Sequence, residues 1–313
     1  MGNKLRIVWG LRVENFDQLL GSVKRWDARF KHTKQTDYLP GVNATIKLSN
    51  TTNLRLSGSQ TVIRPEQREL ASLTLYDFEL NSAVQGNPDL VRTKVTNADL
   101  RYEVYPRPGE ALTAGVFFKH FDKPIEQILQ QGGAIFTYLN PEKATAYGVE
   151  IEMRKRLDMI NVLSNFTLQA NAAYIKSNVK DETRKIDRPL QGQSPYLLNL
   201  GLMYDLEKSG LNATLLFNQI GKRIYLVGDI PASGGGGAPD IWEASRPILD
   251  FQIGKKLLRK KAEIRLNVSD ILNRTQYFYQ NRDENTSFQQ DLDAYRFTRK
   301  FGTSYSITFN YSL

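Results

Sequence analysis

The side chains that could carry acid–base or metal chemistry are few in this sequence and lie far apart. His32 and His120 are its two histidines, and each falls in or beside a long polar connection. The chain has no cysteine, which excludes disulfides, thiolate metal sites and a cysteine nucleophile. We therefore expect a surface or interface role for both histidines, and we predict no catalytic residue.

Two carboxylates share one face of an alternating segment. Glu150 and Glu152 stand two residues apart, and a pair of carboxylates is what a glycosidase uses. Arg154 continues the same face, so a charge-balanced wall is the ordinary interpretation. The pair Gly221-Lys222 lacks the upstream glycine of a phosphate-binding loop, so the sequence supports no nucleotide site. We predict no cofactor.

Two polar stretches near the C-terminal end could form binding loops. One supplies carboxylate and amide oxygens of the kind calcium prefers, but without the spacing of a known calcium loop, from Asp283, Glu284, Asn285, Asp291 and Asp293. A solvated acidic loop is the expected state, and no metal site is predicted. The other holds four consecutive glycines, Gly234–Gly237, which suit a hinge of a binding loop or a disordered tip.

The dominant pattern of the chain is a strict alternation of apolar and polar residues, the mark of strands with one apolar face. It is clearest at the C-terminal end, where Tyr305, Ile307 and Phe309 alternate with polar residues. Twelve segments alternate in this way: Lys4–Glu14, Gly41–Ser49, Leu54–Ser59, Ala98–Val104, Leu112–Lys119, Tyr147–Arg154, Phe166–Tyr174, Leu198–Leu206, Leu211–Asn218, Leu249–Leu257, Ala262–Ser269 and Phe301–Leu313.

The connections between these segments also alternate, short with long. Tight turns are expected at Asn50–Asn53, Pro106–Gly109, Glu207–Gly210 and Arg259–Lys261. The six long connections are Asn15–Tyr38, Thr61–Val91, Phe121–Lys143, Val179–Pro195, Ile224–Ser245 and Arg274–Tyr295, the third with a short helix expected at Ile125–Leu129. Short turns at one end and long loops at the other are typical of outer-membrane barrels. The sequence predicts an all-β chain forming an antiparallel, up-and-down transmembrane β-barrel, in preference to a soluble sandwich or solenoid.

The net charge and the N-terminal residues give weaker evidence about partners and export than the alternation does. The net charge is +9, with the basic residues dispersed along the chain, which predicts a solvated surface first and contact with anionic lipid or lipopolysaccharide second. Dispersal of this kind disfavours nucleic acid as a partner. The first residues have no apolar core and no cleavage site of a signal peptide. We expect that the natural N-terminal part is missing or that the chain is not exported.

Six short motifs give the chain a family resemblance. In order and spacing they resemble the carboxy-terminal part of TonB-dependent receptors, and they are RPEQREL (Arg64–Leu70), GNPDL (Gly86–Leu90), RPLQGQSPYLLNLGLMYD (Arg188–Asp205), IGKRIY (Ile220–Tyr225), RPILDFQIGKKL (Arg246–Leu257) and VSDILN (Val268–Asn273). The resemblance implies a 22-stranded transporter with a plugged lumen. It also implies energy supplied from the inner membrane for uptake of a chelated metal, cobalamin, an oligosaccharide or a peptide.

Twelve segments make only about half of such a wall. We therefore interpret residues 1–313 as the C-terminal portion of an outer-membrane β-barrel, with the plug domain and signal peptide absent. The expected partners are the plug domain, an inner-membrane energy-coupling complex, outer-membrane lipid and lipopolysaccharide, and the ligand. The expected place is the cell outer membrane, and no enzyme activity is predicted. The long loops and the lumen-facing polar residues would meet the ligand, but no individual residue is assigned. The alternative is a self-contained twelve-stranded porin or an assembly or structural barrel.

Overall fold

The structure is a computed structural model, and it describes residues 4–21, 31–130, 135–229, 237–281, 288–289 and 291–312. Its main element is one antiparallel sheet, here called the wall. The wall strands pair in chain order and are β1 (Leu5–Leu20), β2 (Lys31–Lys47), β3 (Thr52–Ile63), β6 (Thr93–Val104), β7 (Ala111–Asp122), β10 (Lys143–Arg156), β11 (Phe166–Asp181), β13 (Tyr196–Leu206), β14 (Leu211–Ile220), β17 (Pro247–Leu257), β18 (Ala262–Ser269) and β21 (Ser304–Tyr311). A short strand, β12 (Ile186–Arg188), is added to β11.

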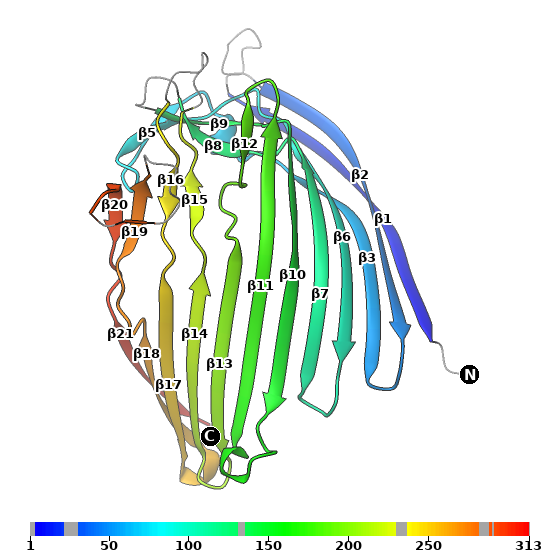
Figure 1. The fold of residues 1–313 in the computed structure, drawn as a ribbon, viewed down its shortest axis with the longest axis vertical. Coiled ribbons are helices and arrows are strands. Elements are labelled where there is room, and N and C mark those ends of the chain that lie inside the picture. Colours follow the sequence, from blue (N-terminus) through cyan, green and yellow to red (C-terminus); the bar gives the residue numbers. More distant parts are fainter. Residues whose placement is uncertain are drawn as a thin grey trace.

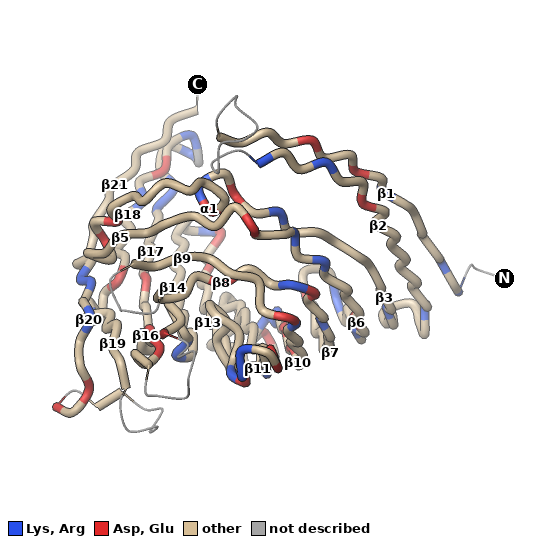
Figure 2. The backbone as a smooth tube through the Cα atoms, turned by 90° about the horizontal axis from the view of Figure 1, so that it is seen from above, with Lys and Arg blue, Asp and Glu red and all other residues tan. Residues whose placement is uncertain are grey.

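The wall runs up and down and curves into a trough (Figure 1). Seen from above it forms an arc with β1 and β21 at its two ends (Figure 2). Among the described strands, β1 pairs only with β2 and β21 only with β18. The predicted antiparallel, up-and-down architecture of twelve strands is therefore confirmed, as an open curved sheet.

Strand register places the apolar residues on one surface. Leu266 on β18 lies opposite Ile307 on β21, and the next pair along, Asn267 and Ser306, is polar. A slip of one residue would move every apolar side chain to the other face, so the alternation itself fixes the pairing. The wall thus has an apolar convex face and a polar concave face.

Tight turns close one end of the wall, as predicted. In the turn before β14, Gly210 has a φ of +66°, and a Cβ added there would lie 2.9 Å from the Cβ of Lys256. Gly109, before β7, has a φ of +83°. Both backbones need the conformational freedom of glycine. Two single 3₁₀ turns complete this end, η1 (Asn161–Leu163) and η2 (Leu258–Lys260).

The long connections are more ordered than the sequence indicates. They fold into two four-stranded sheets at the opposite end, here called the cap, together with helix α1 (Gln67–Leu70). One cap sheet contains β4 (Thr74–Asp77), β5 (Ser82–Gln85), β8 (Glu126–Leu129) and β9 (Ile135–Leu139). The other contains β15 (Arg223–Leu226), β16 (Ile241–Glu243), β19 (Gln276–Gln280) and β20 (Ala294–Arg299). Within the arc of Figure 2 lie α1, β5, β8 and β9.

Two predictions about these connections are wrong. The helix expected at Ile125–Leu129 is strand β8, because its backbone pairs with β9 and with Val227 from a distant segment. The loop expected at Asn15–Tyr38 is mostly strand, since β1 extends to Leu20 and β2 begins at Lys31. Hydrogen bonds between two strands do not depend on the polarity of their side chains, so the ladder continues beyond the apolar residues.

Most of the large buried hydrophobic side chains lie in the cap, and a smaller buried cluster of Ala144, Val179 and Ile186 lies on β10, β11 and β12. The largest cluster draws on both cap sheets and contains Leu80, Leu129, Phe136, Leu226, Ile241 and Phe278. The apolar face of the wall, by contrast, is largely exposed, with 79% exposure for Trp9 and 77% for Ile307. A surface of this kind is stable only against an apolar surrounding.

Candidate functional site

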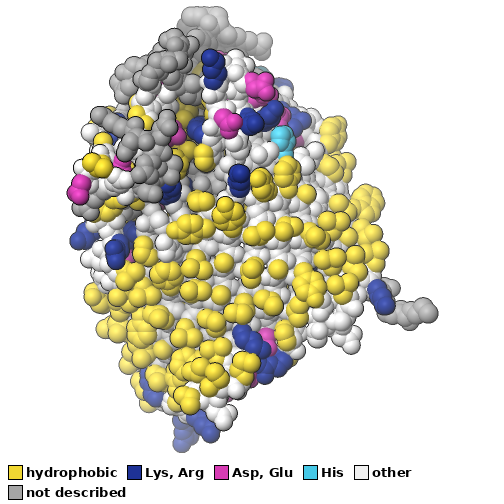
Figure 3. Space-filling view, viewed as in Figure 1, with side chains coloured by type: hydrophobic (Ala, Val, Ile, Leu, Met, Phe, Trp, Pro, Cys, Tyr) yellow, Lys and Arg dark blue, Asp and Glu magenta, His cyan; other side chains and the backbone are white. Residues whose placement is uncertain are grey.

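The convex face of the wall carries a continuous apolar band. Hydrophobic side chains cover the middle of this face, and charged side chains gather above and below it (Figure 3). Aliphatic residues such as Val149 and Leu215 lie exposed within the band, and aromatic residues such as Tyr147 and its cross-strand partner Phe118 lie toward its upper edge. An apolar belt with aromatic girdles matches the lipid-facing surface of an outer-membrane barrel.

The concave face is polar and carries ion pairs between strands. Arg55 on β3 binds Glu103 on the neighbouring strand β6 at 2.9 Å, and the side chain of Glu103 is 5% exposed. Arg101 on β6 lies 3.9 Å from Glu150 on β10, across the intervening strand β7. These are the charges that the sequence places on the polar face of the strands. The concave face therefore has the character of a wet lumen, lined by paired charges.

The motif around Arg188 fastens the cap to the wall. Arg188 donates two hydrogen bonds to Glu126 on β8, at 3.1 and 2.7 Å, and the Glu126 side chain is 1% exposed. Gln191 accepts a hydrogen bond from the backbone N–H of Gln127 and donates one to the carbonyl oxygen of Tyr225, each at 2.8 Å. This one segment thereby joins β8 of the first cap sheet to β15 of the second.

A second group of ion pairs holds both ends of the segment 64–92, which is the first connection that folds into the cap. The chain leaves the wall at Arg64 and returns at Arg92, and both guanidinium groups bind Asp37 on β2, at 2.7 and 2.6 Å. Asp37 is buried, and Arg64 also binds Glu14 on β1 at 2.6 Å. The Arg64 guanidinium lies 4.8 Å from the ring centroid of Phe16. One carboxylate thus ties α1, β4 and β5 to the wall.

The two cap sheets are joined directly to each other. The backbone N–H of Leu129 donates to the carbonyl oxygen of Val227 at 3.0 Å. Arg299 on β20 binds Glu79, between β4 and β5, at 2.6 Å, and its guanidinium lies 5.0 Å from the ring centroid of Phe278. The shared apolar core and these links make the cap one folded unit.

The last two motifs meet near the C-terminal strand. Arg246, just before β17, binds Asp270, just after β18, at 2.7 Å. The Asp270 carbonyl oxygen accepts a hydrogen bond from Thr303, and the Arg246 guanidinium lies 5.3 Å from the ring centroid of Phe301. Four of the six motifs that carry the family resemblance, those containing Arg64, Arg188, Arg246 and Asp270, are therefore anchors of the cap and of the strand ends.

An exposed aromatic hairpin is a feature that the sequence interpretation missed. The β4–β5 hairpin exposes Leu73, Leu75, Tyr76 and Phe78, the last at 87%. The Tyr76 and Phe78 rings pack edge to face, 5.0 Å between centroids. A cavity of about 180 Å³ lies beside the hairpin and is bounded in part by Arg68 and Tyr138. An exposed apolar patch away from the lipid band marks an interaction surface.

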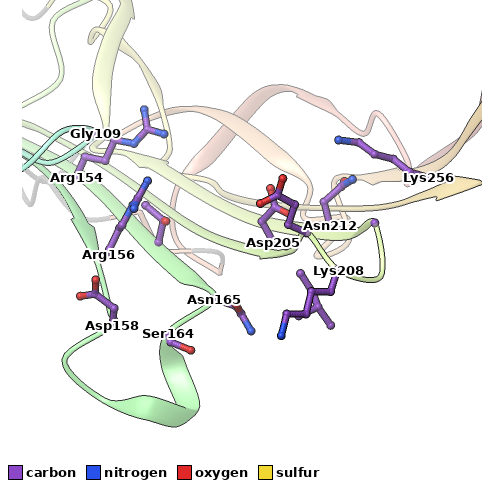
Figure 4. Close-up of a pocket in the computed structure, with 14 residues that line it drawn as sticks. Gly109, Arg154, Arg156, Asp158, Ser164, Asn165, Asp205, Lys208, Asn212 and Lys256 are labelled. Carbon is purple, nitrogen blue, oxygen red and sulfur yellow. The ribbon is translucent and has the colours of Figure 1, made fainter. Parts of the chain in front are cut away.

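A larger cavity lies at the turn end of the wall, on its concave face. It has a volume of about 750 Å³ and is lined mainly by polar side chains (Figure 4). Arg154 and Arg156 from β10 line one side, and Lys208 from the turn after β13 and Lys256 from β17 line the other, with Asp205 between them. Besides these four basic side chains, the carboxylates of Asp158, Asp205 and Glu207 line the cavity.

The residues weighed for chemistry do not come together. His32 pairs with Asp17 at 2.7 Å on the convex face, and His120 lies on β7. The negative charge of Glu150 has Arg101 as its partner. Arg154, which was expected to balance this charge, instead lines the larger cavity at the turn end of the wall. Burial lowers the pKa of Lys222, whose ammonium lies 5.5 Å from the ring centroid of Trp242.

Part of the weighed acidic and glycine-rich stretches lies outside the described residues, namely Asp283, Glu284, Asn285 and Gly234–Gly236. Asp293 is buried and accepts a hydrogen bond from the backbone N–H of Gln289. Among the described residues, no group of three or more histidine or acidic side chains could hold a metal ion. In that same part of the chain, no helix is long and apolar enough to cross a membrane.

Comparison with solved structures identifies the same fold in bacterial receptors. A ferric enterobactin receptor of Pseudomonas aeruginosa in complex with enterobactin matches with a TM-score of 0.64 and 15% identity, over 99% of this chain and 43% of that one. The siderophore receptor of Acinetobacter baumannii gives 0.60 and 18%, over 100% and 44%. The ferric-catecholate import receptor of Escherichia coli K12 gives 0.63 and 15%, over 99% and 42%.

The chain therefore spans less than half the length of each of these receptors, and at such identities the likeness shows the fold alone. None of the curated proteins compared with the chain matches it. The model of the outer membrane protein beta-barrel family matches residues 1–311. The chain thus belongs to the outer membrane protein beta-barrel family, and its place is the outer membrane.

Proposed function

We propose that the chain forms part of the barrel wall of a TonB-dependent receptor that imports its ligand actively across the outer membrane. The observation that carries this proposal is the folded cap at the loop end of a polar trough. A passive pore needs an open lumen, whereas a capture receptor needs a built surface at its entrance. The cap has its own apolar core and is tied to the wall by Glu126 and Asp37, so it is a built surface.

The remainder of the barrel is part of the same proposal. The described strands leave one edge of β1 and one edge of β21 open, and an open edge invites pairing. Barrels of 22 strands enclose a plugged lumen. We propose that further strands complete the wall, that a plug domain fills it, and that an inner-membrane complex supplies the energy.

For the ligand we propose a chelated metal, and in particular a ferric siderophore. The three receptors compared above are described as ferric enterobactin, siderophore and ferric-catecholate receptors. The β4–β5 hairpin is the proposed capture surface, because Tyr76 and Phe78 offer exposed rings that stack on aromatic ligand groups. Cobalamin, oligosaccharides and peptides are the other classes to be tested.

Uptake of radioactive iron bound to enterobactin tests the proposal in cells that express the full-length protein. We expect uptake that stops when an uncoupler collapses the proton gradient. The double variant Tyr76→Ala/Phe78→Ala should lower the affinity about tenfold or more, as loss of aromatic anchors does. The matched control is Met159→Ala/Val162→Ala, two exposed apolar residues at the turn end. Uptake that persists with the uncoupler, together with solute flux through liposomes, would establish the porin alternative.

A further inference from the structure

A small cavity lies where the loop end of the β1–β2 hairpin meets the segments that enter and leave the cap. Its volume is about 250 Å³. Leu20, opposite Lys31 on the hairpin, packs against the cap cluster that contains Leu70 and Leu90, so the hairpin end lies beside α1 (Figure 2). This space is here called the clamp cavity, because it adjoins the ion pairs that hold segment 64–92.

Basic side chains line the clamp cavity from both sides, and in the described part of the chain no carboxylate lines it. Two of the cations come from the hairpin and two from the ends of segment 64–92, and they are Lys31, Lys34, Arg64 and Arg92. Glu66 and Asp89 each neighbour a lining residue in sequence, but both are exposed and neither lines the cavity. The larger cavity at the turn end mixes acidic with basic side chains, so a purely basic lining is not a general property of the concave face.

The carboxylates that hold these cations lie outside the lining, and each of them is shared. Asp37 binds two guanidinium groups, Glu14 binds two at 2.6 and 2.7 Å, and Asp17 binds a lysine at 3.0 Å and a histidine at 2.7 Å. Lys31 has no ion-pair partner among the described residues. Basic side chains therefore outnumber carboxylates in this network, which consists of Arg12, Lys31, Lys34, Arg64 and Arg92 with Glu14, Asp17 and Asp37.

Three side chains of the lining keep donors that have no acceptor within the described chain. Arg64 Nε is buried and makes no hydrogen bond. The Arg92 side chain donates only through Nε, to Asp37, which leaves its two terminal nitrogens. The Lys31 ammonium makes no hydrogen bond. Buried donors in proteins are nearly always satisfied, so this cavity fits an acceptor that comes from outside these residues.

We propose that the clamp cavity binds a small oxyanion, a carboxylate or a phosphate, which links the β1–β2 hairpin to the cap. Guanidinium groups match the geometry of these oxyanions and bind them in preference to a spherical ion. Sites for drug-sized ligands have volumes of about 300–1,000 Å³, so the cavity is too small for a whole siderophore. Lys31 and Phe16 face the concave side, away from the lipid-facing band. The inference goes beyond the proposed uptake function and does not depend on it.

Titration calorimetry of the full-length protein in dodecyl maltoside and Tris chloride tests the inference. Inorganic phosphate and malonate are titrated separately, and we expect saturable binding of at least one of them at a single site. The unfolding temperature should rise with its concentration, because the anion binds the folded state. Binding of phosphate alone would identify free phosphate as the occupant, and binding of malonate alone an organic acid. If neither binds more tightly than chloride at equal ionic strength, the inference is overturned.

Variants of one lysine locate the site. Lys31→Gln should weaken binding about tenfold, since it removes one charged hydrogen bond, and Lys31→Arg should retain it. Arg92→Lys keeps a charge beside Asp37 but removes the planar fork, and should also weaken binding. The matched control is Lys47→Gln, on the same strand and face but at the turn end, which should bind as the wild type does. Full affinity in Lys31→Gln, or an equal loss in Lys47→Gln, would rule out the clamp cavity as the site.

Discussion

Glu126 and Arg188 form a two-pronged ion pair between segments 62 residues apart in sequence, with both oxygens of the carboxylate engaged. The carboxylate is also bound by the backbone N–H of Gln191 at 3.1 Å. Because the Glu126 side chain is 1% exposed, the pair replaces water as the partner of a buried charge. It joins the cap strand β8 to β12, the short strand added to β11 of the wall.

Breaking this pair should destabilise the protein strongly. Arg188→Leu leaves Glu126 as a buried charge without its partner, which costs about 3–5 kcal/mol. Urea unfolding of the full-length protein in detergent, followed by tryptophan fluorescence, measures this loss. Asp187→Asn, at the exposed pair with Lys180, is the control and should cost less than about 1 kcal/mol. Equal effects of the two variants would contradict the anchoring role of Glu126.

Loss of Asp37 should loosen one part of the cap and leave the far wall unchanged. Asp37→Asn removes the charge that binds Arg64 and Arg92, so each guanidinium loses a charged partner, worth about 1.5–3 kcal/mol. Hydrogen exchange should become faster in α1, β4 and β5, with β13 and β14 as internal controls. An increase spread evenly over the molecule would argue against a local clamp.

Adjacent residues on β18 test the assignment of the two faces. Leu266 lies on the convex face and Asn267 on the concave face. Leu266→Arg should cost about 2–4 kcal/mol at mid-bilayer depth, whereas Asn267→Arg should cost little. A folding titration into liposomes measures both. Similar costs at the two positions would mean that the convex face does not contact lipid.

Acid should weaken the turn end through Glu110. Hydrogen bonds from Arg107, at 2.6 and 3.1 Å, and then from Lys155 and the backbone of Arg156 lower the pKa of Glu110 to about 2. A carboxylate with a lowered pKa contributes stability that is complete above its ordinary pKa of 4.5 and is lost as the pH falls toward 2.

The variant Glu110→Gln isolates this contribution. The free energy of unfolding of the wild type should fall relative to that of the variant between about pH 4.5 and pH 2. Chemical unfolding in detergent at several pH values gives the two curves. Parallel curves over this interval would show that Glu110 contributes no pH dependence.

The wall could be predicted from the sequence because neighbouring residues carry the pattern that predicts it. The alternation at Leu266 and Asn267 predicts which face each side chain occupies, and the tight turns predict which strands pair. The cap could not be predicted, because its strands have three to six residues and pair with distant segments. Glu126 stands in a stretch with helical spacing, and only its contacts with β9, Val227 and Arg188 make it part of a strand.

The candidate functional surfaces also depend on contacts between distant residues, which the sequence alone does not predict. Arg64, Arg188 and Arg246 stand out in the sequence through family resemblance, but their carboxylate partners lie 24 to 62 residues away. The exposed rings of Tyr76 and Phe78 give no periodic signal, since a short hairpin in a cap has no repeating face.

The contrast between wall and cap also sets an order of assembly. Every wall strand pairs with the next wall strand, so each step of growth closes a short or moderate length of chain. The cap joins residues as distant as Glu79 and Arg299, 220 positions apart, and such contacts form only after the intervening chain has been ordered. We therefore expect a folding intermediate with a complete wall and an unfolded cap. Burial of Phe278 in the core shared by the two cap sheets would then be among the last steps of folding.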